Sequence, residues 1–166
     1  LGGVFYIDGN PLLTDITHTA STETFSQYYA YSCNLTGNHD MSMLPGLGNL
    51  FWVFDNPLLT GITHTASTDT FSRYWAYSCD LDYVNFLPLS GITMTGDIQL
   101  QDNNMTADNV NQILIDFDNI STNLNPAGWT GTTLDISGTN SQPTGPGITA
   151  LSSLTGGTNN WTITTS

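Results

Sequence analysis

Short segments in which apolar and polar residues alternate recur along this chain. The pattern apolar-x-apolar-x-x-(Asn or Cys)-x-apolar occurs five times, and its copies begin at Phe5, Tyr28, Phe51, Tyr74 and Ile98. These starting positions are 23 or 24 residues apart. Because alternate residues of a strand face opposite sides of a sheet, each copy predicts a short strand that ends in a turn. Two weaker copies of the pattern follow, at Leu134-x-Ile136 and Trp161-x-Ile163.

A longer repeat contains these segments in pairs. Residues 5–35 align with residues 51–81 without a gap, and 22 of the 31 positions are identical. Self-similarity at a fixed period is typical of solenoid proteins, in which each unit packs only against its neighbours. The sequence therefore predicts a solenoid with a stacked parallel β-sheet.

The segments between the predicted strands differ along the chain. Residues 16–22 and 62–68 both read ITHTAST, an alternating and β-branched sequence that predicts an extended return segment. From Thr106 the apolar residues instead follow helical spacing, at Val110, Ile113, Leu114, Phe117 and Ile120. We expect one helix here, capped by Thr106 or Asp108.

A second, shorter helical turn is expected near the end of the chain. Its apolar positions are Ile148, Leu151 and Leu154. It would follow a group of helix breakers, at Pro143, Gly145, Pro146 and Gly147.

The repeat unit resembles that of the leucine-rich-repeat family, L-x-x-L-x-L-x-x-N/C-x-L. Two copies match every position, with Phe25, Tyr28, Ala30, Cys33 and Leu35 in one and Phe71, Tyr74, Ala76, Cys79 and Leu81 in the other. Leu-Thr-Gly at 35–37 and Leu-Pro at 44–45 are similar to the LTG…LP arrangement of the family's extracellular repeats. Residues 97–166 are loosely similar to the C-terminal end of repeat proteins of bacterial surfaces and phage tail fibres.

This resemblance implies a β-rich α/β fold, a leucine-rich-repeat-like solenoid with mostly extended return segments and a C-terminal helical unit. Residues 1–105 would form an array of five units, and residues 106–166 would form degenerate repeats that cap it within a single continuous domain. It also implies an extracellular or surface-exposed location, on a secreted protein, a cell surface or a virion fibre.

The register of the predicted strands places aromatic residues in two columns on the outer face of the sheet. One column contains Tyr6, Tyr29, Trp52 and Trp75, and the other contains Tyr31, Phe54 and Tyr77. Neighbouring strands lie about 4.8 Å apart, so these side chains would form a contiguous strip. Such a strip either stabilises the sheet by ring stacking alone or binds a partner.

The Asn or Cys position of the pattern predicts a ladder inside the turns, made by Asn10, Cys33, Asn56, Cys79 and Asn103. The two cysteines would be two layers, or about 10 Å, apart, which is beyond disulfide reach. We therefore expect both to be free and buried thiols with a structural role.

The three histidines do not predict a metal site. His18 and His64 also occupy equivalent positions two layers apart, so we expect them, with His39, to be exposed or edge imidazoles. The acidic residues Asp102, Asp108, Asp116 and Asp118 match no calcium-loop spacing and are expected on the solvated surface. We find no phosphate loop, metalloprotease motif or nucleophile elbow, so we expect no cofactor and no catalysis.

Charge and processing signals limit the partners. The 166 residues carry a net charge of −13 and a single cationic side chain, Arg73, which argues against nucleic acid. No apolar segment has the length of a membrane span, and the initial Leu1 suggests a processed chain or a fragment. Four Asn-x-Ser/Thr triplets are possible glycosylation sites, at Asn34, Asn104, Asn119 and Asn160.

Two functions from different classes follow from these patterns. The first is an extracellular recognition or adhesion module whose aromatic face binds a glycan or a protein. The second is a structural subunit whose uncapped first strand contacts another copy head to tail, which would build a filament or fibre. A surface fibre could combine both.

Overall fold

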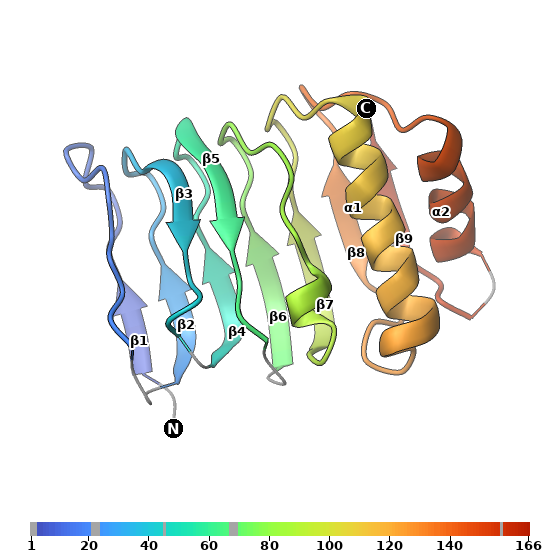
Figure 1. Cartoon of the computed structure of the whole chain (residues 1–166), viewed down its shortest axis with the longest axis horizontal. Coiled ribbons are helices and arrows are strands. Elements are labelled where there is room, and N and C mark those ends of the chain that lie inside the picture. The colour runs from blue at the N-terminus through green and yellow to red at the C-terminus, as the bar shows by residue number, and fades with distance from the viewer. Residues whose placement is uncertain (1–2, 21–23, 45, 67–69, 157) are drawn as a thin grey trace.

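The computed structural model describes residues 3–20, 24–44, 46–66, 70–156 and 158–166, and in it the chain forms a parallel β-solenoid (Figure 1). One seven-stranded sheet runs the length of the molecule in the order β1-β2-β4-β6-β7-β8-β9. Its strands are β1 (Gly3–Tyr6), β2 (Phe25–Tyr29), β4 (Leu47–Trp52), β6 (Thr70–Trp75), β7 (Thr93–Gln99), β8 (Thr133–Ile136) and β9 (Thr162–Thr165). Every neighbouring pair is parallel, so each layer of the solenoid adds one strand.

The register predicted from the repeat is confirmed through β8. Phe5 pairs with Tyr28, and the same column continues through Phe51, Tyr74, Ile98 and Leu134. At β9 the prediction is wrong, because Leu134 pairs with Ile163 and not with Trp161. Trp161 instead lies just before the strand, where it is buried and its Nε1 donates to the Trp129 carbonyl at 2.6 Å. The size of the Trp161 side chain and its hydrogen bond thus determine where this residue lies, whereas strand alternation does not.

A second, two-stranded parallel sheet forms within the return segments. It pairs β3 (Thr36–Asp40) with β5 (Leu58–Thr63). The expected extended conformation of ITHTAST is seen only in part, because the described residues include 16–20 and 62–66 of the two copies. Residues 62–63 belong to β5, whereas 16–20 are irregular. The predicted Leu-Pro element at 44–45 also lies partly outside the described residues, at Pro45.

The predicted helix is confirmed as α1 (Ala107–Asn119). Thr106 is its N-cap, because the threonine side chain accepts a hydrogen bond from the Asn109 amide at 3.3 Å. All five apolar residues of the helical pattern are fully buried. The helix continues as one π-helical turn, η2 (Ile120–Leu124), while the short 3-10 helix η1 (Leu87–Leu89) occupies an earlier return segment.

The second helix is longer than expected. α2 runs over Gly145–Thr155, so Gly145, Pro146 and Gly147 form its first turn rather than precede it. Proline is tolerated there because the first amides of a helix have no intrahelical acceptor. Gly147 is required by close packing, since a Cβ atom at this position would overlap the Asn111 side chain of α1.

The hydrophobic core lies between the seven-stranded sheet and the layer of return segments. Figure 1 shows that β3, β5, α1 and α2 follow one another along this second layer. The inward strand positions carry stacked rings, with centroid distances of 4.6 Å for Phe5–Tyr28, 5.5 Å for Tyr28–Phe51 and 4.8 Å for Phe51–Tyr74. None of the described helices has the length and apolarity needed to cross a membrane.

Candidate binding surface

The outward positions of β1, β2, β4 and β6, the first four strands of the large sheet, bring the predicted aromatic residues together. Strand pairing places Tyr6, Tyr29, Trp52 and Trp75 in one column. Tyr31, Phe54 and Tyr77 form the parallel column just beyond the strand ends, where rings of adjacent layers are stacked. We call these seven residues the aromatic strip. Tyr6 is 59% exposed and the other six are partly exposed, so the strip lies at the surface.

Along the solenoid axis the strip contains two kinds of ring contact. The first column meets edge to face from Tyr6 through Tyr29 to Trp52, whereas the Trp52–Trp75 pair and the whole second column are stacked face to face. Trp52 and Trp75 are parallel to within 6°, with centroids 4.6 Å apart, and Phe54 and Tyr77 are parallel to within 4° at the same distance. A stacked ring has a neighbour on its face, so the stacked part of the strip presents mainly ring edges to solvent. Ring stacking therefore stabilises the sheet, and the surface it leaves is a corrugated apolar ridge.

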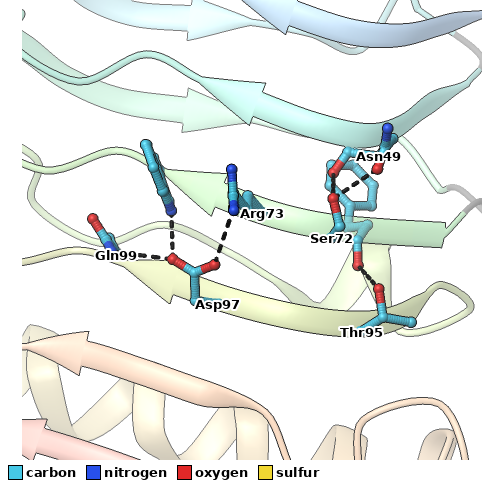
Figure 2. Close-up of polar contacts among 8 residues, drawn as sticks. Asn49, Ser72, Arg73, Thr95, Asp97 and Gln99 are labelled. Carbon is cyan, nitrogen blue, oxygen red and sulfur yellow. Dashed lines mark hydrogen bonds and ion pairs between the residues drawn. The ribbon is translucent and has the colours of Figure 1, made fainter.

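The strip ends at β7 in a polar cluster (Figure 2). Asp97 accepts hydrogen bonds from Trp75 Nε1 at 2.6 Å and from Gln99 Nε2 at 3.1 Å, and it forms an ion pair with Arg73 at 3.7 Å. The Arg73 guanidinium also lies 5.3 Å from the centroid of the Trp75 ring. The only cation of the chain is thus bound at the C-terminal end of the strip, where the outward positions become Gln99 and Gln101.

The structure places the asparagines of the predicted ladder as backbone connectors between layers. Asn56 Nδ2 donates to the Ala30 carbonyl at 2.8 Å and to the Val53 carbonyl at 2.7 Å, and Asn103 makes the equivalent bonds. Asn10 is exposed and donates only to the nearby Asp8 carbonyl among the described contacts. Sequence reasoning missed Asn140, which plays the same role for the next layer but comes one residue later in the pattern.

The cysteines alternate with these asparagines as predicted. Cys33 and Cys79 are both free and buried. The Cys79 thiol donates to the carbonyls of Val53 and Tyr77, each at 3.4 Å, as a weak substitute for the asparagine amide. Burial raises the pKa of this thiol to about 12, which suits an inert structural group rather than a nucleophile.

The expectation of exposed or edge histidines is wrong for His39 and His64. His39 and His64 are buried, and His18 is half-buried. The Tyr28 hydroxyl lies 2.7 Å from His39 Nε2 and 2.9 Å from His18 Nε2, while the Tyr74 hydroxyl lies 2.8 Å from His64 Nε2. The imidazoles satisfy the hydroxyl groups of tyrosines that lie in the core. The co-repetition of His and Tyr ten residues apart was the signal that could have revealed these pairs.

The acidic residues expected on the surface do not form one cluster. Asp116 is buried, where it accepts hydrogen bonds from the Tyr83 hydroxyl and from Gln112. Asp102 instead contacts the Thr139 amide, from the following layer. In the part of the chain that the structure describes, no group of three His, Cys, Asp or Glu side chains could hold a metal ion.

The four glycosylation triplets lie in different environments. Asn104 and Asn160 are exposed, and both have a positive φ, of 58° and 53°. Asn34 and Asn119 are partly buried. The exposed pair is therefore sterically more accessible to a modifying enzyme than the other two.

Comparison of this chain with family models, with the sequences of curated proteins and with solved structures finds no match.

Proposed function

We propose that this protein is a non-catalytic recognition or adhesion module of an extracellular surface, and that the aromatic strip binds a glycan or a protein. The observation that supports this proposal is the continuity of the strip, because scattered apolar residues are normal on a soluble surface whereas contiguous ones mark interaction sites. The other outward positions of the same columns are polar, including Gln99, Gln101 and Ser137.

The geometry of the strip restricts how a ligand would bind. The faces of Trp52 and Trp75 cover one another, so a sugar ring would contact ring edges and the outer ring of a stack rather than insert between rings. The tyrosines add hydroxyl groups that donate and accept hydrogen bonds. A partner that lies flat across several layers, such as an extended polysaccharide or an apolar protein ridge, fits this surface best.

The charge of the chain selects among such partners. A net charge of −13 repels polyanions, and the guanidinium of Arg73 is already bound by Asp97. Neutral glycans and neutral or basic protein surfaces are therefore the ligand classes that we propose.

The relationship to leucine-rich repeats belongs to the same proposal. It is supported by the buried Asn56 and Asn103 side chains, which bond the backbone at the Asn/Cys position of the repeat. The extracellular location rests on the resemblance of the sequence to surface repeats.

A binding screen with matched variants tests the function. The chain is applied to a glycan array and to surface-protein extracts, and every hit is repeated with a double variant, Trp52→Ser with Trp75→Ser. A second double variant, Trp52→Phe with Trp75→Phe, keeps the stacked rings and serves as the control. We expect the serine variant to lose at least about tenfold in affinity, equivalent to about 1.4 kcal/mol, while the phenylalanine variant stays closer to wild type.

Circular dichroism of each variant verifies that the solenoid is intact. Equal binding by the wild-type chain and the folded serine variant would refute the proposal. A screen in which the wild-type chain retains no ligand would also count against it.

A further inference from the structure

The helices α1 and α2 lie side by side in the return layer and are joined near their N-terminal ends (Figure 1). Asn111 of α1 donates from Nδ2 to Thr144 Oγ1 at 2.9 Å, and its Oδ1 accepts from the Thr144 amide at 2.8 Å. At the opposite ends, a cavity of about 390 Å³ lies between α2 and η2, the turn that continues α1. We call this cavity the interhelical pocket. It lies between two consecutive coils, and its lining residues come from both.

Neutral polar side chains line the interhelical pocket. Hydroxyl or amide groups come from Ser121, Thr122, Ser152, Ser153, Thr158 and Asn159, and no described residue of the lining is charged. The Thr122 hydroxyl donates to the Asp118 carbonyl at 2.6 Å, and the Ser152 hydroxyl donates to the Ile148 carbonyl at 2.9 Å. Both hydroxyl oxygens keep lone pairs that can accept a hydrogen bond from a ligand. The amide of Asn159 adds N–H donors and a carbonyl acceptor.

The Ser121 hydroxyl differs from the others in its hydrogen bonding. Ser121 is 1% exposed, and its hydroxyl has no hydrogen-bond partner among the described residues. Thr122 and Ser152 bond carbonyls of their own helices, whereas Ser121 in the π-helical turn η2 does not. Single π-helical turns recur at functional sites, and buried hydroxyls are nearly always hydrogen-bonded because an unpartnered one has lost its hydration. Ser121 is therefore the group of the pocket that gains most from a ligand.

The electrostatics of the pocket disfavour an anionic ligand. Both η2 and α2 end beside it, and the C-terminal end of a helix carries a partial negative charge. The chain has a net charge of −13, and its single cationic side chain, Arg73, lies in β6. A cationic ligand is disfavoured as well, because no carboxylate is present among the described lining residues to pair with it. A neutral ligand with hydrogen-bonding groups fits these conditions.

The size of the pocket restricts the ligand further. A volume of about 390 Å³ is at the lower end of the range for small-molecule sites, about 300–1,000 Å³. We propose that the interhelical pocket binds a small neutral polyhydroxylated ligand, a monosaccharide or a polyol. Hydroxyl groups of this ligand donate to Thr122 and Ser152 and accept from Ser121 and Asn159. The inference is independent of whether the aromatic strip binds a ligand, because the strip lies on the outer face of the sheet and the pocket lies in the return layer.

An NMR titration of the whole chain tests this proposal. The isotope-labelled protein is titrated with glucose, galactose, N-acetylglucosamine and glycerol, each to about 100 mM. We expect at least one of these probes to cause saturable shifts centred on the amides of the pocket residues, with a Kd of about 10 mM or tighter. Because no charged group takes part, about 0.5 M NaCl should leave this Kd unchanged.

Two variants locate the site and separate binding from folding. Ser153→Leu fills part of the pocket and should weaken binding at least about tenfold. Ser121→Ala removes the unpartnered hydroxyl and should weaken binding about threefold or more. The thermal unfolding midpoint of this variant, without ligand, should stay within about 2 °C of wild type, because no bond within the described chain is lost. Thr155→Ala, also on α2 but outside the lining, is the matched control and should leave the Kd unchanged.

Three results would overturn the proposal. One is a titration in which none of the probes shifts the pocket amides. Another is a fall of more than about 5 °C in the unfolding midpoint of Ser121→Ala, because the hydroxyl would then stabilise the fold through an interior water. The third is a set of shifts that survives Ser153→Leu and disappears in the variant with Trp52→Ser and Trp75→Ser. That result would place the sugar on the aromatic strip and so support the function proposed above.

Discussion

The Tyr74 hydroxyl and His64 Nε2 lie 2.8 Å apart in the interior of the solenoid, where the tyrosine is fully buried. This inward strand position can hold a tyrosine because the imidazole of the same repeat satisfies the hydroxyl. Burial strongly raises the pKa of this tyrosine and lowers that of the histidine to about 3, so the pair is neutral at physiological pH. The repeat at Tyr28 uses two imidazoles for the same purpose.

Removal of one member of this pair should destabilise the fold. Tyr74→Phe leaves His64 Nε2 buried without its partner, which costs about 1–3 kcal/mol of unfolding free energy. The double variant, Tyr74→Phe with His64→Leu, should lose less than the sum of the two single variants. Urea unfolding measures all three, with Tyr77→Phe as a surface control that changes stability by no more than about 0.5 kcal/mol. Additive losses would contradict the pairing.

Stability should fall as the solution is acidified below pH 6.5. Burial lowers the pKa of His39 to about 4, helped by the nearby His18, and that of His64 to about 3. The unfolded chain protonates these imidazoles near pH 6.5 while the folded chain does not. Stability is therefore fully present above this pH and decreases by about 1.4 kcal/mol per pH unit for each imidazole as the pH falls toward the folded values.

Urea unfolding at pH 7.5, 6, 5 and 4.5 measures this slope. The variant with His64→Leu and Tyr74→Phe should retain the part of the slope that comes from His39 and from His18, whose pKa burial also lowers. A wild-type stability that is flat over this range would show that the imidazoles accept protons in the folded state.

The asparagines of the interior ladder should be far more sensitive to substitution than the first one. Asn56→Ala removes hydrogen bonds to two buried carbonyls and to the Leu35 amide, and it should cost about 3 kcal/mol. Asn10→Ala removes one exposed bond and should cost less than about 0.5 kcal/mol. Chemical unfolding of both variants compares equivalent positions of one duplication. Similar losses at the two positions would contradict the interlayer role.

The two thiols should react only when the solenoid opens. Burial holds the pKa of Cys79 near 12, and both cysteines are inaccessible in the fold. With a thiol-specific disulfide reagent at pH 8, the native chain should release no fast burst, and the urea-unfolded chain should titrate two thiols at once. Rapid labelling of either cysteine in the native state would contradict their burial.

The position of the aromatic strip could be predicted from the sequence, whereas its geometry could not. Strand alternation alone places Tyr29, Trp52 and Trp75 on one face, because the side-chain period of a strand is two. Whether neighbouring rings stack or meet edge to face depends on rotamers and on contacts such as that of Trp75 with Asp97. That choice determines which part of each ring a ligand can reach.

Sequence reasoning failed where two distant segments decide a residue's environment. His39 and His64 were expected at the surface because nothing local to them indicates burial, and the tyrosines they contact belong to other segments of the coil. Asp116 was expected on the surface for the same reason, although the Tyr83 hydroxyl meets it in the interior. The register of β9 was misplaced because both Trp161 and Ile163 are apolar, and only packing against Trp129 selects between them.

The sequence by itself determined the period, the register of the first six strands of the large sheet and the helix after Thr106, because each leaves a local and repeated pattern. The tertiary structure decided the β3–β5 sheet, the His–Tyr pairs and the start of α2 at Gly145. These features depend on contacts between layers and between helices. The apolar pattern of a segment indicates which of its faces is buried. The side chains that contact this face are determined only when the layers stack.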